Sequence, residues 1–126
     1  MKIRMHDDAD LTLAEFEAPE FEVEADPGAD AHYSAMQMFA TSLGLCTASV
    51  LIEYGERFGA GPDGLEVRVR WSYAEEPYRI GEIEMDVAWP ELPDNRLDAA
   101  RRAAEQCTIH NTLLTPPGIV TRVSNG

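Results

Sequence analysis

The chain has 126 residues, which is enough for one domain of ordinary size and too few for two. It carries 23 Asp and Glu against 10 Lys and Arg, a net charge of −13. Nucleic-acid binding and attachment to an anionic membrane both depend on clustered Lys and Arg, so this balance argues against both. Hydrophobic residues make up 44% of the sequence, a globular composition that excludes general disorder.

The acidity has two interpretations. Lys2 is the only lysine, and acidic residues outnumber the arginines. A salt-rich cytoplasm would screen such a surface, whereas a GC-rich genome and a need for solubility would give the same composition. The N-terminal residues MKIRMHDDADLTL contain neither an apolar run nor a small-residue cleavage site. We therefore expect a cytoplasmic protein, in whose reducing surroundings a permanent disulfide between Cys46 and Cys107 would be unusual.

Residues 1–31 form an acidic N-terminal segment with ten acids and two bases. Leu11 and Leu13 alternate with polar residues, and so do Phe21, Val23 and Ala25 farther along. This period of two predicts strands with one solvated face, ended by the turn residues Asp-Pro-Gly at 26–28. We expect a short meander of two or three strands.

Residues 35–52 read AMQMFATSLGLCTASVLI, eighteen positions without a charge. The run contains several polar residues, its flanks are acidic, and no Lys or Arg anchors the nearer end. Insertion into a bilayer would be poor, so we expect no membrane span here. The segment is predicted to be a buried central helix over residues 33–58.

That helix is apolar on nearly every side. Its apolar positions form two stripes, one of Phe39, Leu43, Cys46 and Val50 and the other of Met38, Leu45 and Ile52. One small sheet covers only one face of a helix, so other helices or a second subunit must cover the rest. From this we predict a homodimer.

Two runs within residues 64–89 alternate apolar and polar positions, joined by the short connection AEEPYR. This pattern predicts an antiparallel hairpin. Arg68 and Arg70 should face Glu84 and Asp86 across the strands and pair with them on a solvated face.

A second helical region is predicted over residues 94–115, with Asp94 as its N-cap. Leu97, Ala100, Ala104 and Cys107 share one face of this helix, which directs Cys107 toward the core. Apolar residues at 119, 120 and 123 predict a last strand over residues 118–124. The expected fold is a single α+β domain in the order βββ-α-ββ-α-β.

Several common catalytic signatures are absent: the sequence contains no GxxxxGK[ST], HExxH, CxxC or GxSxG. Cys46, Cys107 and His110 would make only an incomplete zinc site, so we expect no metal and no bound cofactor. The two cysteines lie on apolar stripes of different helices and can approach each other although 61 positions separate them. They are then either a redox pair or two packing residues, because free cysteine is often simply buried.

Two segments resemble the cysteine regions of the OsmC/Ohr family, the osmotically inducible and organic-hydroperoxide-resistance proteins. Residues 42–46, Ser-Leu-Gly-Leu-Cys, resemble the family's x-x-Gly-x-Cys in a helix of small residues. Residues 107–113, Cys-Thr-Ile-His-Asn-Thr-Leu, are similar to its Cys-Pro-x-His-x-Thr-Leu, with Thr108 in place of proline. The hairpin and the order of elements agree as well.

The resemblance implies an intertwined homodimer that reduces hydrophobic organic hydroperoxides. In that interpretation Cys46 attacks the peroxide and becomes a sulfenic acid, and Cys107 condenses with it to a disulfide that an external dithiol reduces. The alternative within the same fold is a non-enzymatic dimer that binds a small apolar ligand or senses redox state. A purely structural dimer is the third possibility.

A reactive Cys46 needs something that stabilises its thiolate. In the family this is an N-terminal arginine oriented by a glutamate ten positions before the peroxidatic cysteine. Here Met36 occupies that position, and Arg4 is the only N-terminal arginine. His110 and Glu53 are further titratable residues near the two motifs, with exposed or structural roles as their simpler explanation.

Overall fold

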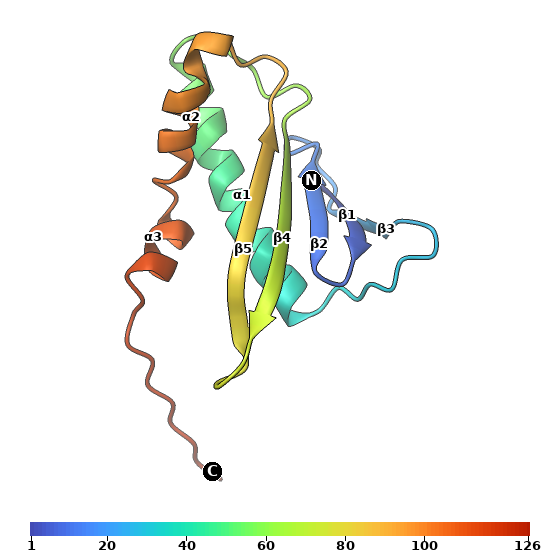
Figure 1. Cartoon of the computed structure of the whole chain (residues 1–126), viewed down its shortest axis with the longest axis vertical. Helices are drawn as coiled ribbons and strands as arrows, with labels where there is room; N and C mark the ends of the chain where they lie inside the picture. Colours follow the sequence, from blue (N-terminus) through green and yellow to red (C-terminus); the bar gives the residue numbers. More distant parts are fainter.

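In the computed structural model, which describes residues 1–126, one face of a five-stranded sheet is covered by helices (Figure 1). The strands are β1 (Lys2–Asp7), β2 (Asp10–Ala14), β3 (Glu22–Ala25), β4 (Glu66–Ala74) and β5 (Arg79–Ala88). The helices are α1 (Ala35–Glu56), the 3-10 turn η1 (Asp94–Arg96), α2 (Leu97–Ala104) and α3 (Thr108–Leu114). The predicted α+β class and the three N-terminal strands are confirmed, but the predicted meander is wrong, because β3 pairs in parallel with β1 and not with β2.

The strand order in the sheet is β3-β1-β2-β4-β5. β1 and β3 are parallel, and every other neighbouring pair is antiparallel. β5 is an edge strand, so one row of its backbone N–H and C=O groups has no partner within the chain. That edge lies on the side of the sheet toward α2 and α3 (Figure 1).

The inner face of the sheet forms the core with α1. Six side chains from its three central strands are at most 5% exposed: Ile3, Met5, Leu11, Leu13, Val67 and Val69. Each such burial contributes about 1.5–3 kcal/mol relative to an exposed side chain. The alternation seen in the sequence therefore decides which face of the sheet receives the helix.

Helix α1 is fixed at its start and crosses the sheet closely at its middle. The Gln37 side chain accepts from the backbone N–H of Ser34 at 3.0 Å and donates to the carbonyl of Asp8 at 2.6 Å, which ties the helix to the β1–β2 turn. A Cβ added at Gly44 would lie 2.6 Å from Cδ1 of Leu13. Glycine at this position therefore lets the helix approach β2, two residues before Cys46.

The outward side of α1 is incompletely covered by its own chain. Met36, Met38 and Leu45 are 38%, 53% and 39% exposed. By length and composition alone, α1 would also be long and apolar enough to cross a membrane. Because its other side packs on the sheet and its polar Gln37 is buried in that contact, we interpret it as the core helix of the domain.

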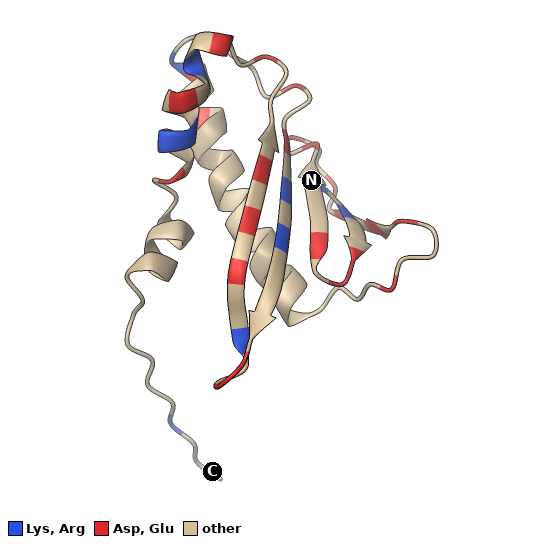
Figure 2. Cartoon of the chain, in the orientation of Figure 1, with Lys and Arg blue, Asp and Glu red and all other residues tan.

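The outer face of the sheet is charged, and Figure 2 shows basic residues along β4 beside acidic residues along β5. Arg70 pairs with Asp86 and, at 3.3 Å, with Glu84. Arg68 lies opposite Asp86 in the register, yet it pairs with Asp10 of β2 at 2.6 Å. The hairpin and its register are thus confirmed, whereas the predicted partner of Arg68 is wrong because β2 offers a closer carboxylate.

The predicted helix over residues 94–115 is broken into η1, α2 and α3. Asp94 begins only the 3-10 turn, and the chain leaves the helical path after Ala104 and re-enters it at Thr108. α2 and α3 both pack against α1 (Figure 1). The periodicity of the apolar residues did not reveal the break, because Cys107 is buried at the break just as it would be on the apolar face of an unbroken helix.

The predicted last strand over residues 118–124 is absent. The segment after α3 runs away from the domain (Figure 1), and Ile119, Val120 and Val123 are 87%, 73% and 91% exposed. No strand of the same chain pairs with this segment. Without such a partner its apolar pattern forms no strand.

Candidate functional site

Cys46 lies in the middle of α1, two residues after the close crossing at Gly44. Its side chain is partly exposed, unlike the fully packed residues of the same helix that face the sheet. A small molecule arriving from the helical side can therefore reach this sulfur more easily than the buried Cys107.

Cys107 occupies the break between α2 and α3. Its backbone is extended, with φ −61° and ψ 134°, and it is the N-cap residue of α3. The side chain is 0% exposed. The break therefore places a buried thiol at the point where the N–H groups of the first turn of α3 have no partner within the helix.

The two thiols lie within hydrogen-bonding reach of each other. Burial opposes ionisation of Cys46, but the thiol of Cys107 and the backbone N–H groups of Ile109 and Thr108 all donate to its sulfur. Together these donors outweigh burial and hold the pKa of Cys46 below its ordinary value. The Thr108 donor exists only because this position is not proline, which has no N–H.

The pKa of Cys107 is shifted in the opposite direction. Burial raises the pKa of its thiol most, and donation to Cys46 raises it further. The pair is thus asymmetric, with an accessible sulfur favoured as thiolate and a hidden one favoured as thiol.

Arg4 does not approach Cys46. It alternates along β1 with the core residues Ile3 and Met5, so it points to the opposite face of the sheet from α1. There it pairs with Glu24 and, at 3.1 Å, with Asp26. Arg4 as the activating arginine is therefore wrong for this chain, and backbone N–H groups act on Cys46 instead.

The remaining residues considered from the sequence lie at different distances from the thiols. Met36 is 38% exposed near the start of α1 and has no acidic group. Glu53 lies near the other end of α1, exposed, beside Arg57 in a small surface pocket. His110, on α3, is partly buried and faces the helical side of the sheet.

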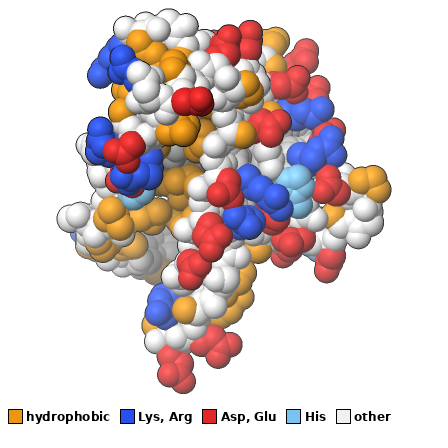
Figure 3. Space-filling model, turned by 45° about the horizontal axis from the view of Figure 1, so that its top comes forward, with side chains coloured by type: hydrophobic (Ala, Val, Ile, Leu, Met, Phe, Trp, Pro, Cys, Tyr) orange, Lys and Arg blue, Asp and Glu red, His pale blue; other side chains and the backbone are white.

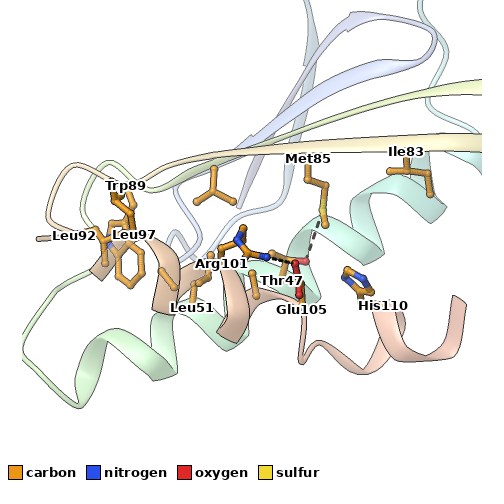
Figure 4. Close-up of a pocket in the computed structure, with 13 residues that line it drawn as sticks. Thr47, Leu51, Ile83, Met85, Trp89, Leu92, Leu97, Arg101, Glu105 and His110 are labelled. Carbon is orange, nitrogen blue, oxygen red and sulfur yellow. Dashed lines mark hydrogen bonds and ion pairs between the residues drawn. The ribbon is translucent and has the colours of Figure 1, made fainter. Parts of the chain in front are cut away.

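A cavity of about 480 Å³ opens between β5, α1 and α2. Nine of its 13 lining residues are hydrophobic, and Figure 4 shows Met85 and Ile83 of β5 facing Thr47 of α1, with His110 at the end toward α3. Hydrophobic side chains gather in this hollow between the helices and the charged hairpin (Figure 3). Thr47, the residue after Cys46, lines this cavity, whereas neither Cys46 nor Cys107 does.

A second hollow of about 360 Å³ continues the first along β5, and His110 and Met85 line both. It is lined mainly by apolar residues of α1, β5 and α3. The two hollows together form an apolar groove along the free edge of the sheet. An elongated apolar molecule would fit such a groove better than a small polar one.

No group of three or more His, Cys, Asp or Glu side chains is placed to hold a metal ion. His110 therefore does not join Cys46 and Cys107 as a third ligand. The chemistry available at the site is that of two neighbouring thiols.

Sequence reasoning missed the donors to Cys46. It sought a cation in the N-terminal region, whereas the stabilising groups are N–H groups of residues 108 and 109, next in sequence to Cys107. The only available signal was Thr108 itself, which supplies an N–H where the resembled motif has none.

The chain is thus an α+β domain with two cysteines between its central helix and a short C-terminal helix. The chain belongs to the OsmC-like protein family, whose model matches residues 26–122. Comparison with curated proteins and with solved structures gives no match.

Proposed function

We propose that this protein reduces organic hydroperoxides through Cys46 and Cys107. The observation that supports this most is the asymmetric pair, in which the accessible thiol has the lowered pKa and the buried thiol lies beside it. The family includes peroxidases, which is consistent with this assignment.

The reaction consists of peroxide reduction at Cys46, disulfide formation with Cys107 and reduction of that disulfide. The Cys46 thiolate attacks one oxygen of the hydroperoxide, the O–O bond breaks, and the leaving alkoxide takes a proton and departs as the alcohol. Cys46 is now a sulfenic acid. The Cys107 sulfur attacks the Cys46 sulfur, the hydroxyl leaves as water, and a disulfide forms. An external dithiol returns the two electrons.

The substrate class follows from the groove beside Thr47. Its apolar lining favours fatty or aromatic hydroperoxides over hydrogen peroxide, because transfer of their hydrocarbon part from water contributes to binding. His110 lines both hollows and offers a polar group at their junction.

We further propose that the working form is a homodimer. Met38 and Leu45 on α1 and Val120 in the C-terminal segment are large apolar side chains exposed in the single chain. The free edge of β5 is a place where the C-terminal segment of a second copy can add as a strand. Sedimentation tests this, and a folded monomer at micromolar concentration would contradict it.

A non-enzymatic binder or redox sensor is the second candidate. It is favoured by one observation, namely that no guanidinium or ammonium group lies among the groups that shift the pKa of Cys46. Such a protein would hold an apolar ligand in the groove and oxidise slowly or not at all.

Titration of the reduced protein with cumene hydroperoxide and hydrogen peroxide separates the two candidates. For a peroxidase we expect rapid loss of both thiols, a preference for cumene hydroperoxide, and over-oxidation of Cys46 in Cys107→Ser. The matched variant Cys46→Ser should keep its remaining thiol. Thiols that survive a stoichiometric amount of peroxide for minutes would contradict the peroxidase and favour the binder.

A further inference from the structure

A carboxylate, an imidazole and a hydroxyl lie in line on the outer face of the sheet, away from the thiols. Nδ1 of His6, on β1, is 2.8 Å from Oδ2 of Asp26, and its Nε2 is 2.7 Å from Oγ1 of Thr12 on β2. Two neighbouring strands and the residue that directly follows β3 therefore contribute one group each. None of these contacts is needed for the chemistry at Cys46.

The direction of each hydrogen bond follows from the groups involved. An ionised carboxylate only accepts, so Nδ1 of His6 carries a proton and donates to Asp26. In the neutral imidazole Nε2 is then an acceptor, and the hydroxyl of Thr12 donates to it. This is the arrangement in which an imidazole can take the proton of a hydroxyl nucleophile.

Two hydrogen bonds fix the orientation of the Asp26 carboxylate. Its hydrogen bonds with His6 and then Arg4 lower the pKa of its carboxyl, and Nη1 of Arg4 donates to its second oxygen, Oδ1, at 3.1 Å. The carboxylate thus has one oxygen on Arg4 and one on His6. The fixed carboxylate orients the imidazole of His6, and Nε2 of that imidazole is the acceptor for the Thr12 proton.

The hydroxyl opens onto a hollow of about 470 Å³. Its lining is polar and of mixed charge, with Lys2 and Arg4 balanced by Glu15 and Glu66, and Ala14 is its one apolar lining residue. Arg4 lies opposite Thr12 in the β1–β2 register.

Two of these three residues lie outside the part of the chain that matches the family model. The OsmC-like model begins at residue 26, so His6 and Thr12 precede it and only Asp26 falls inside. The family match therefore does not account for the cluster.

We propose that Thr12, His6 and Asp26 form a second site, which hydrolyses small polar carboxylic esters. Oγ1 of Thr12 adds to the ester carbonyl while its proton passes to Nε2 of His6. The bond to the leaving alkoxide breaks, the alkoxide takes that proton, and an acyl-threonine remains. Water, deprotonated by His6, then attacks the acyl group and releases the carboxylic acid with Thr12 restored. Asp26 is a positioning residue.

The test uses p-nitrophenyl acetate as the probe and follows release of nitrophenolate. Because thiols also attack activated esters, the full chain is used with Cys46→Ser and Cys107→Ser together. We expect kcat/KM to fall about 100-fold in Thr12→Val and in His6→Gln, the lower end of what general-base catalysis contributes. Thr12→Ser should retain turnover, and peptide mass spectrometry should find the acetyl group on Thr12.

The matched control is His32→Gln, an exposed histidine 3.7 Å from Asp8, which should leave turnover unchanged. Circular dichroism confirms that each variant folds, and Asp26→Asn provides an independent variant should His6→Gln not fold. Turnover in Thr12→Val equal to that of the His32 control would overturn the proposal. So would an acetyl group found only on Lys2 or the N-terminal amine. The peroxide titration is a separate measurement, so a negative ester assay would not contradict the peroxidase, nor would a negative peroxide titration contradict the esterase.

Discussion

The two faces of the sheet are built from alternate residues of the same strands, yet they serve different ends. The inner face is apolar, carries α1 and sets the position of Cys46 through the crossing at Gly44. The outer face is a charged surface on which Arg68 and Arg70 pair with carboxylates of neighbouring strands. Position along a strand therefore decides whether a residue contributes to packing and thiol chemistry or to surface electrostatics.

The largest difference between the faces should appear in reactivity toward peroxide. Replacement of Cys46 by serine removes the only accessible thiol, so reduction of cumene hydroperoxide should fall more than about 1,000-fold. Arg70→Gln, on the outer face, should leave the rate unchanged. The rate of hydroperoxide loss measures both. Equal rates in Cys46→Ser and wild type would contradict the role given to the inner face.

The next effect concerns stability. Leu13 is 0% exposed and contacts α1, so Leu13→Ala should lower the free energy of unfolding by about 2–5 kcal/mol. Urea denaturation followed by circular dichroism measures the change. A loss below about 1 kcal/mol would show that α1 does not pack on β2 as described.

A third prediction concerns the donors to Cys46. Thr108→Pro removes one N–H, so the pKa of Cys46 should rise and the thiolate fraction at neutral pH should fall. The rate of peroxide reduction should drop several-fold near pH 7, and its pH profile should move to higher pH. The backbone accepts the change, since Cys107 is already extended and residue 108 is the first of α3.

Thr108→Ala is the matched control for this prediction. It keeps the backbone N–H and loses only the side chain, so the pH profile should stay where it is in wild type. A shift of equal size in both variants would mean that the side chain, and not the N–H, acts on the site.

The smallest effect is expected for an ion pair on the outer face. Arg68→Ala removes the contact with Asp10, and because Arg68 is largely solvated the free energy of unfolding should change by less than about 1 kcal/mol. The change should shrink further in high salt, which screens exposed charges. A loss as large as that of Leu13→Ala would erase the distinction between the two faces.

The sequence patterns predicted the elements whose residues repeat regularly. Alternation in the hairpin predicted its register, and the uncharged run predicted α1 within two residues at each end. The break at residues 105–107 escaped prediction, because periodicity shows which residues are buried and not where the backbone leaves the helix. The final strand was predicted from apolar residues alone, although a strand also needs a neighbouring edge.

At the candidate site, helical phase and family resemblance together predicted that Cys46 and Cys107 act as a pair, which stays a prediction. The donors from residues 108 and 109 were missed because backbone groups are the same at every position and leave no signal until the chain direction is known. The contacts between His6, Thr12 and Asp26 were missed for a related reason. The contact of His6 with Asp26 depends on β1 pairing in parallel with β3, a pairing that local sequence does not encode.

The central claim is that the two thiols differ, Cys46 being accessible and acidic while Cys107 is hidden and held as a thiol. Alkylation of the reduced protein by iodoacetamide across a range of pH, with each cysteine followed by peptide mass spectrometry, tests it directly. We predict that Cys46 reacts first, with a midpoint below the ordinary thiol value, and that Cys107 lags at every pH. Faster labelling of Cys107, or identical profiles for both, would contradict the account.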